Sequence, residues 1–417
     1  MITLKNCTYY EMNAWIKKDI VISGEDIINI GNHLHEGEVI DCDGLYVLPS
    51  FIDPHVHFRQ PGFEHKETIQ TGSLAAAAGG YTTVFAMPNL NPVPDHLNRL
   101  LQMKDTIQKE AVIEVIQLGS ITKGQKGEGS FSDMLEMAPH TVGFSDDGRG
   151  ITHTKDMYEA MLLAKKANTT IIAHCEDEDL LYDGYIRKGT YSARMNHKGI
   201  LGITETTQLA RDLVLALETK VHFHVCHLST KQSVDLIRFY KSLGCNVTCE
   251  VSPHHLILSE MNLKEDGNFK MNPPLGSLED QAALISGLLD HTIDCIATDH
   301  APHAESEKKT LKDAAFGIVG LETAFPLLYT HFVKTNVMNL HQLSQFMSEN
   351  VSKIFNLPVH EIKVGHKANL TIVNVSDAYT IDSNTFKSKS KNQPFDGTEV
   401  YGRVIKTMYK GTFVYGK

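Results

Sequence analysis

The feature that most constrains the fold of this chain is a series of eight short apolar runs between residue 47 and about residue 350. Helical stretches, in which apolar positions recur at spacings of three and four residues, separate the runs. Strands that are apolar throughout are buried on both faces, as in parallel sheets covered by helices. The pattern predicts an α/β fold with a parallel (β/α)8 TIM-type barrel, and a doubly wound open sheet is the alternative. The expected strands are 47–58, 81–87, 112–120, 141–145, 170–174, 220–227, 246–251 and 292–298.

The two ends of the chain show a different pattern from the middle. Short runs of alternating apolar and polar residues, separated by turn signals that contain glycine, fill residues 1–46 and return after Leu357. Each end is too short to bury a core of its own. We expect residues 1–46 and 358–417 to pair into one small β-sandwich domain beside a barrel domain formed by residues 47–357.

Composition limits the classes of partner that this chain of 417 residues is expected to have. The net charge is −11 and no basic cluster occurs, which argues against binding to nucleic acid or to an anionic membrane surface. No apolar run approaches the roughly 18 residues of a membrane span. The first ten residues lack the regions of a signal peptide, and the seven cysteines are scattered, which is typical of a reducing compartment. We expect a cytoplasmic protein without nucleic-acid or membrane partners.

Metal-binding types of residue stand at the carboxyl ends of five of the eight expected strands, where barrel enzymes carry their chemistry. His55 and His57 are two residues apart in an extended strand, so they share a face. Further along come Asp146-Asp147, His174, His227 and Asp299-His300. Four imidazoles and two carboxylates are sufficient to hold two divalent ions when one anionic ligand bridges them. Neighbouring strand residues face opposite ways, so only one of Asp146 and Asp147 is expected to point inward.

Several motifs extend this pattern to a resemblance with a known family. They are His55-Val56-His57-Phe58-Arg59, Met87-Pro88-Asn89, Ser145-Asp146-Asp147-Gly148, Ala173-His174-Cys175-Glu176, His224-Val225-Cys226-His227, Met271-Asn272-Pro273-Pro274, Thr298-Asp299-His300-Ala301-Pro302-His303 and Phe316-Gly317. Through them the whole chain resembles the amidohydrolase superfamily, and within it the bacterial dihydroorotases of the long-chain type. The Asp-His-Ala-Pro-His segment is more specific than His-x-His, which many relatives share.

The resemblance implies a pair of zinc ions, Zn2+, in each subunit. His55 and His57 would hold the first ion, His174 and His227 the second, with Asp147 as the bridge and Asp299 at the first ion. Many cyclic-amide hydrolases of this superfamily use a carboxylated lysine on strand four as the bridge. Residues 141–148 contain no lysine, which argues against a hydantoinase, a dihydropyrimidinase or an allantoinase.

The implied reaction interconverts N-carbamoyl-L-aspartate and L-dihydroorotate in pyrimidine biosynthesis. Zinc lowers the pKa of bound water from about 15.7 to about 7, so that hydroxide attacks the ring amide carbonyl. Asp299 would be the catalytic acid–base residue that passes the proton to the ring nitrogen. The residues expected to contact the substrate are His57, Arg59, Asn89, Asn272, His303, Phe316 and Gly317. Among them, Arg59 suits the unreactive carboxylate through its planar fork of donors.

Two other functions are considered beside this one. Another cyclic amidohydrolase, such as an allantoinase, would share the metal pair but act on a different ring. An inactive dihydroorotase-like protein would act as a structural partner of aspartate carbamoyltransferase. Such proteins typically lose metal ligands, whereas this chain retains all six. We expect a homodimer, for which an association with aspartate carbamoyltransferase is also considered.

Some residues near the motifs are expected to be structural. Cys175 and Cys226 adjoin ligand histidines and should point away from the metals, and His222 and His224 should face the helix layer because their parity is opposite to that of His227. Glu176 could orient a ligand histidine or form a surface ion pair. The charged segment 304–312 is expected to be either a mobile lid or a solvated loop.

Overall fold

The eight apolar runs form a closed ring of parallel strands in the computed structural model, which describes residues 1–416. One hydrogen-bonded group contains three strands and another contains five. Parallel bridges between Gly119 and Phe144 and between Val56 and His300 join the two groups at both edges, so the barrel is closed and the open sheet is excluded. The barrel strands are β6 (Phe51–Val56), β7 (Tyr81–Ala86), β8 (Glu114–Gln117), β9 (Gly143–Phe144), β10 (Thr170–Ala173), β13 (His222–Val225), β14 (Val247–Val251) and β15 (Cys295–Ile296).

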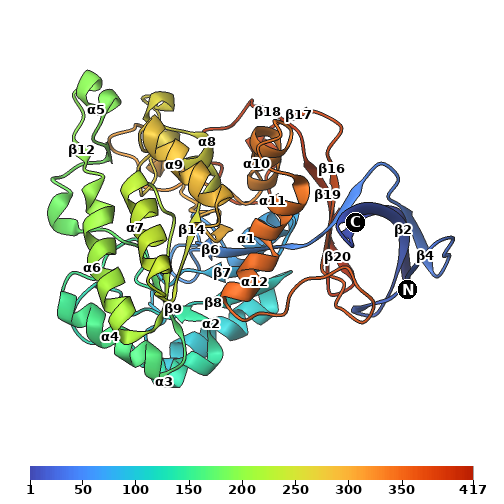
Figure 1. Cartoon of the computed structure of the whole chain (residues 1–417), viewed down its shortest axis with the longest axis horizontal. Helices are drawn as coiled ribbons and strands as arrows, with labels where there is room; N and C mark the ends of the chain where they lie inside the picture. Colours follow the sequence, from blue (N-terminus) through green and yellow to red (C-terminus); the bar gives the residue numbers. More distant parts are fainter. Residues whose placement is uncertain (417) are drawn as a thin grey trace.

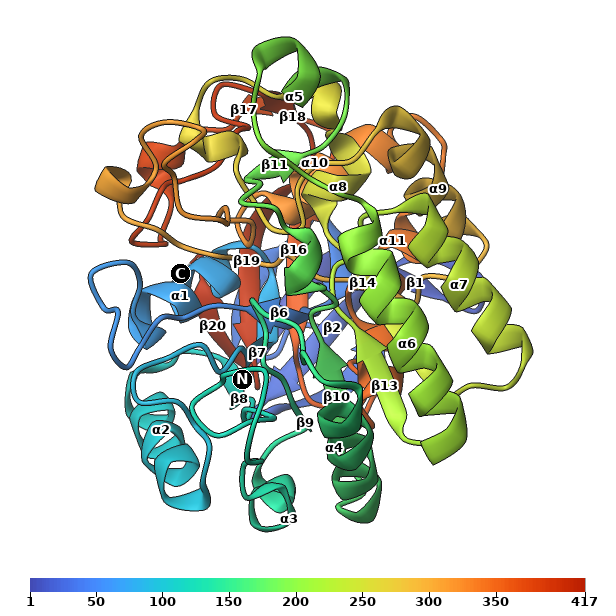
Figure 2. The same cartoon turned by 90° about the vertical axis from the view of Figure 1, so that its left-hand side faces the viewer.

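Helices surround this ring, as the view along the barrel in Figure 2 shows. Six of them lie within a few residues of the stretches with helical spacing, which confirms that pattern. Their starts are encoded locally: at α9, the Ser277 hydroxyl accepts from the Asp280 amide and the Asp280 carboxylate accepts from the Ser277 amide. The six helices are α1 (Ile69–Ala78), α2 (Leu97–Glu110), α4 (Thr154–Lys166), α6 (Ile203–Thr219), α7 (Lys231–Ser242) and α9 (Leu278–Leu289).

The interior of the barrel has its own small apolar cluster. Alternate residues of the strands point into it, while their neighbours pack outward against the helices. Phe355, which follows α12 (Glu349–Ile354), packs into the same cluster. The other fully buried members include Ile52, Phe85, Leu118, Ile172, Cys226 and Cys295. The opposite rim, at the carboxyl ends of the strands, is thereby left for polar side chains.

The two ends of the chain pair into one sheet, at the right of Figure 1. This confirms the expected joint β domain, although its hydrogen-bonded strands belong to a single curled sheet instead of two separate facing sheets. Residues 47–49, which the continuous apolar run assigns to the barrel, pair with β16 instead, because the chain changes sheets at the buried Ser50. The strands are β1 (Ile2–Glu11), β2 (Ala14–Ser23), β3 (Asp26–Gly31), β4 (Glu38–Asp41), β5 (Tyr46–Pro49), β16 (Leu370–Asn374), β19 (Arg403–Tyr409) and β20 (Thr412–Tyr415).

Part of the C-terminal segment leaves this sheet and covers the barrel. Between β16 and β19 it forms the short ladder of β17 (Tyr379–Thr380) and β18 (Glu399–Val400). Ile381 and Phe395 pack in a cluster with barrel residues such as Leu311. The buried Asn392 accepts a hydrogen bond from the His303 amide, so the C-terminal segment reaches the loops above the strand ends.

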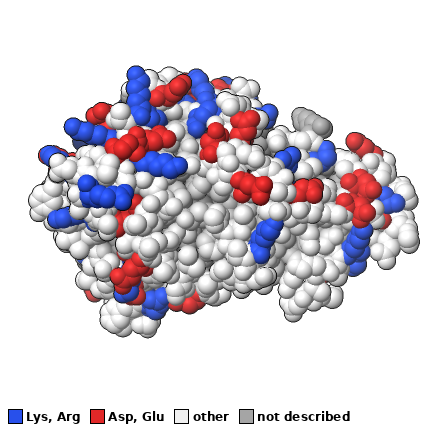
Figure 3. Space-filling view, turned by 90° about the horizontal axis from the view of Figure 1, so that it is seen from above, with Lys and Arg blue, Asp and Glu red and all other residues white. Residues whose placement is uncertain are grey.

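Charges are distributed without a single-sign patch on the face that Figure 3 shows, where acidic and basic side chains are interspersed. Among the described residues, no helix is both long enough and apolar enough to cross a membrane.

Candidate active site

The six residues expected to bind metal come together at the carboxyl rim of the barrel, and all six are buried. Asp299 Oδ1 lies 3.1 Å from His57 Nε2 and 3.5 Å from His55 Nε2. Irregularities in β6 pairing between Asp53 and Val56 adjust the strand there. His55, His57 and Asp299 thus offer three ligand atoms within 4.8 Å of one another.

A second group of three ligands lies beside the first. His174 Nδ1 and His227 Nε2 are 3.0 Å apart, and they lie 3.8 Å and 3.7 Å from Asp147 Oδ1. The same carboxylate is 3.3 Å from His55 Nε2 and 3.5 Å from His57 Nε2. Asp147 therefore stands between the two groups, in the position that a bridging ligand needs.

Asp146 faces the other way and is held by the loop after β8. Its carboxylate accepts hydrogen bonds from the backbone amides of Ile121, Thr122 and Gly127 and from the Thr122 hydroxyl. A carboxylate with this many donors shapes a loop and has little capacity left for a cation. The geometry therefore favours Asp147 over Asp146 as the inward residue.

The donor set at the rim fits a divalent cation. His55 Nε2, Asp147 Oδ1 and His227 Nδ1 are buried without a hydrogen-bond partner, although such orphaned polar atoms are rare in folded proteins. Burial raises the pKa of a carboxyl group, but the neighbouring histidines, His55 first, outweigh burial and lower the pKa of both Asp147 and Asp299 below the usual range. Two ionised carboxylates among imidazoles match the ligand preference of zinc-like ions.

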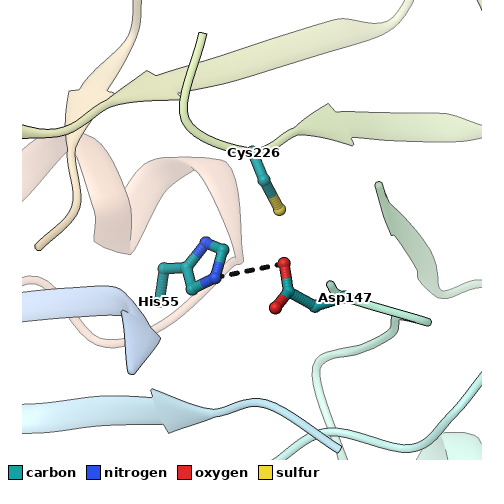
Figure 4. A group of neighbouring side chains, drawn as sticks. All are labelled: His55, Asp147 and Cys226. Atoms are coloured by element: carbon teal, nitrogen blue, oxygen red, sulfur yellow. Dashed lines mark ion pairs between the residues drawn. The ribbon is translucent and has the colours of Figure 1, made fainter. Parts of the chain in front are cut away.

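Cys226 also lies at this centre, contrary to the expectation that it points away. Its sulfur forms a potential ligand group with His55 and Asp147, and Figure 4 shows it pointing toward them. Strand alternation fails here because β13 ends at Val225 and His227 has a φ of 27°. Burial, followed by the charge of Glu250, raises the pKa of the Cys226 thiol well above its usual range, so the thiol is neutral at pH 7.

His224 likewise points into the barrel and not toward the helix layer. Its Nε2 lies 3.1 Å from Glu250 Oε2, and His55 Nδ1 donates to Glu250 Oε1 at 2.7 Å. Although burial opposes it, the charges of His55 and His224 lower the pKa of Glu250 to about 2. Sequence reasoning missed Glu250, for which the available signal was a lone acidic residue inside a buried strand. The bond to Glu250 leaves His55 Nε2 free to face the rim.

Arg59 and His303 form the opposite side of the site. Arg59 is 9% exposed, so it is not a solvated surface arginine. Its Nε donates to the Pro302 carbonyl, and its guanidinium lies 3.3 Å from His303 Nε2, which in turn donates to the Phe316 carbonyl at 2.7 Å. Burial lowers the pKa of Arg59 to about 10, so the group stays a cation at neutral pH.

The two expected asparagines lie beside two of the histidines that are expected to bind metal. His57 Nδ1 donates to Asn89 Oδ1 at 2.9 Å, which leaves His57 Nε2 facing Asp299. Asn272 donates to Glu176 at 3.0 Å, and Glu176 lies 3.6 Å from His174. Glu176 is buried, so it lies beside a site histidine and is not part of a surface ion pair.

A cavity of about 170 Å³ joins these residues. The structure therefore brings nearly all the candidate residues to one place, with His55 buried just beneath the lining. The cavity is lined by His57, Arg59, Asn89, Asp147, Gly148, His174, His227, Asn272, Asp299, Ala301, His303, Phe316 and Gly317.

Comparison with known proteins places this chain in a family. The family model "Dihydro-orotase-like" matches residues 44–233. A dihydroorotase of Fusobacterium nucleatum subsp. nucleatum is 46% identical over 99% of this chain and 98% of its own length. A dihydroorotase of Bacillus subtilis (strain 168) is also 46% identical, over 98% of each chain.

Solved structures agree on the fold. The L-hydantoinase from Arthrobacter aurescens superposes with a TM-score of 0.87 at 24% identity, covering 99% of this chain and 95% of its own. The D-hydantoinase from Thermus sp. superposes with a TM-score of 0.86 at 25% identity and the same coverage. The fold is therefore that of the amidohydrolases, and the chain belongs to the dihydroorotase family, in its long bacterial type.

Proposed function

We propose that this dihydroorotase interconverts N-carbamoyl-L-aspartate and L-dihydroorotate, a step of pyrimidine biosynthesis, in the cavity at the barrel rim. The observation that carries the proposal is the convergence of the buried histidines and carboxylates with Arg59 around one small cavity. The histidines and carboxylates offer a site for cations, and Arg59 offers a site for an anion. A substrate with a reactive amide and a separate carboxylate matches both.

We assign two zinc ions to the two groups of ligands, with His55, His57 and Asp299 at one ion and His174 and His227 at the other. Asp147 would bridge them, as its distances to all four histidines support. When bound, zinc supplies a water of pKa about 7 and polarises a carbonyl oxygen. The lowered pKa of Asp299 keeps its carboxylate ionised at neutral pH.

Asp299 is the residue that would move the proton. It lines the cavity beside His57, whose orientation Asn89 fixes. In ring opening, Asp299 accepts a proton from the attacking water and delivers it to the departing ring nitrogen. In ring closure the same carboxylate works in reverse. Closure removes one carboxylate of the substrate and takes up a proton, so lower pH favours the ring.

The substrate carboxylate that does not react would bind Arg59, with Asn89 and His303 beside it. Asn272 and the backbone at Phe316-Gly317 would contact the ring amide. Gly317 has a φ of 125°, and a Cβ there would lie 2.5 Å from the Cβ of Ala301, so this loop requires glycine.

The test is turnover of L-dihydroorotate and of allantoin by the zinc-loaded protein, with the ring-opened products quantified. We expect turnover of dihydroorotate and a much lower rate with allantoin. Preference for allantoin would refute the substrate assignment. A protein that retains its metals but opens neither ring would support the structural-partner alternative. We also propose a homodimer, which sedimentation of the purified protein would test.

A further inference from the structure

Lys308 is a buried lysine whose hydrogen-bond partners are all backbone carbonyl groups. Its Nζ donates to the carbonyl oxygens of Lys270 at 2.9 Å, Ala315 at 2.8 Å and Gly317 at 2.8 Å. An ammonium group has three N–H donors, so these acceptors use all of them. The side chain is only 6% exposed, although lysine is among the residues that are rarely buried.

The three acceptors belong to two loops that line the cavity. The Lys270 carbonyl lies two residues before Asn272, and the carbonyls of Ala315 and Gly317 flank Phe316. Asn272, Phe316 and Gly317 all line the cavity. The loops also meet directly, because the Gly317 amide donates to the Lys270 carbonyl at 3.0 Å. Lys308 therefore connects the two loops from behind, outside the cavity lining.

The segment that carries Lys308 is itself held against the barrel. Glu307, at the end of the short helix η5 (Glu305–Glu307), lies 3.0 Å from Lys66 Nζ and accepts from the Ala304 amide. The Ala315 amide donates to the Glu307 carbonyl at 2.8 Å, and Leu311 is fully buried in the cluster beneath the C-terminal segment. These contacts indicate that the segment 304–312 is held in place. They favour this over the solvated loop or the mobile lid expected from its charged sequence.

We propose that Lys308 is a positioning residue, which holds the loops 270–272 and 315–317 at the spacing that the substrate ring needs. The inference rests on the proposed function, because it assumes that Asn272, Phe316 and Gly317 contact the ring amide. Burying an ammonium group is unfavourable, and burial with the nearby Lys270 lowers the pKa of Lys308 to about 7. The three carbonyl acceptors favour the ammonium form and so oppose that penalty, because a neutral amine has only two N–H donors.

The experiment compares Lys308→Met, which keeps the length of the chain but removes the donors, with Lys308→Arg and with Lys309→Met. Lys309 is the adjacent, exposed lysine and serves as the matched control. KM and kcat for dihydroorotate, bound metal, the melting temperature, and amide exchange of residues 315–317 without substrate are measured for each variant.

We expect Lys308→Met to raise KM about tenfold while kcat changes less than about threefold, because misplaced contacts weaken substrate binding more than the chemistry. Metal content should stay at the wild-type level, and amide exchange at Gly317 should accelerate. Lys308→Arg should fall between Lys308→Met and wild type, since its planar fork cannot reach all three carbonyls. Lys309→Met should behave as wild type.

Wild-type KM and wild-type exchange in Lys308→Met would overturn the proposal, and so would an equal effect in Lys309→Met. If Lys308→Met does not fold, Lys308→Arg provides the test. A raised KM with full metal content supports the positioning role of Lys308, and a wild-type KM contradicts it. Failure of the proposed function is distinguishable, because the wild-type protein would then not turn over dihydroorotate at all. The amide exchange measurement would still test whether Lys308 holds the loops in place, because it needs no substrate.

Discussion

One wall of the cavity, the strand wall, is formed by the strand ends, and the other, the loop wall, is formed by loops. The polar atoms of the two walls differ in their hydrogen bonding. On the strand wall, His55 Nε2 and Asp147 Oδ1 are buried without hydrogen-bond partners. On the loop wall, Arg59 and His303 donate hydrogen bonds to backbone carbonyls. Lys308, which lies outside the cavity lining, donates to carbonyls of both loops. The barrel fixes the first set in place and leaves their lone pairs for a cation. The loops have no such frame and need internal hydrogen bonds to keep their shape.

Asp147→Ala should have the largest effect on metal binding at the strand wall. Asp147 lies within 4 Å of all four histidines, so its loss should lower metal affinity by more than the roughly hundredfold typical of losing a residue that only supports a ligand. Metal analysis of the purified variant measures this. Asp146→Asn is the matched control: it weakens the bonds to residues 121–127, with a loss of stability of about 1–3 kcal/mol, but should keep its metals. Equal metal loss in both variants would show that the bridge is misassigned.

Asp299→Asn should separate chemistry from binding on the strand wall. The amide keeps the shape of the carboxylate but cannot accept the proton, so kcat should fall by about 10²–10⁴-fold. Most of the metal should remain, because five other ligands are unchanged. Turnover and metal content are measured on the same preparation. A loss of metal as large as that in Asp147→Ala would contradict the proton-transfer role.

Glu250→Gln tests whether the hydrogen bonds of Glu250 to His55 and His227 contribute to metal binding at the strand wall. Glu250 accepts from His55 Nδ1 and from the His227 amide at 3.3 Å, so one buried carboxylate contacts a residue from each group of expected ligands. Its replacement should weaken metal binding by about 10–100-fold, as measured by competition with a chelator. Unchanged affinity would mean that the barrel alone sets the ring orientations.

Arg59→Met should affect the loop wall and leave the strand wall intact. Losing one charge-assisted contact costs about 1.5–3 kcal/mol, which corresponds to a KM for dihydroorotate roughly ten- to a hundredfold higher. Metal content should stay at the wild-type level. If metal is lost instead, Arg59 supports the centre and does not bind the substrate carboxylate.

Much of the strand wall could be predicted from the sequence, because the barrel sets where each strand end lies. His55, His174 and His227 follow apolar runs directly, and they meet as expected. The prediction for Cys226 and His224 was wrong because parity was counted from His227, whose backbone has already left the strand. Where strand alternation stops is decided by tertiary packing, which a single sequence does not display.

The support of the loop wall was less accessible to sequence reasoning. Asn392 donates to the carbonyls of Ala301 and Gly317 from the far end of the chain, and Lys308 lies in a charged run that is typical of a solvated loop. Neither residue stands in one of the motifs named in the sequence analysis, and their bonds go to backbone atoms, which every residue provides. Only the folded path of the chain places them behind the cavity.

We propose that catalysis depends on metal ions held by the strand wall. Titration of the chelator-treated protein with zinc, with dihydroorotate turnover followed at each addition, tests it most directly. We expect no turnover at the start and a rise that ends at about two equivalents of zinc per chain, as two groups of ligands imply. Full turnover before any zinc is added would contradict it.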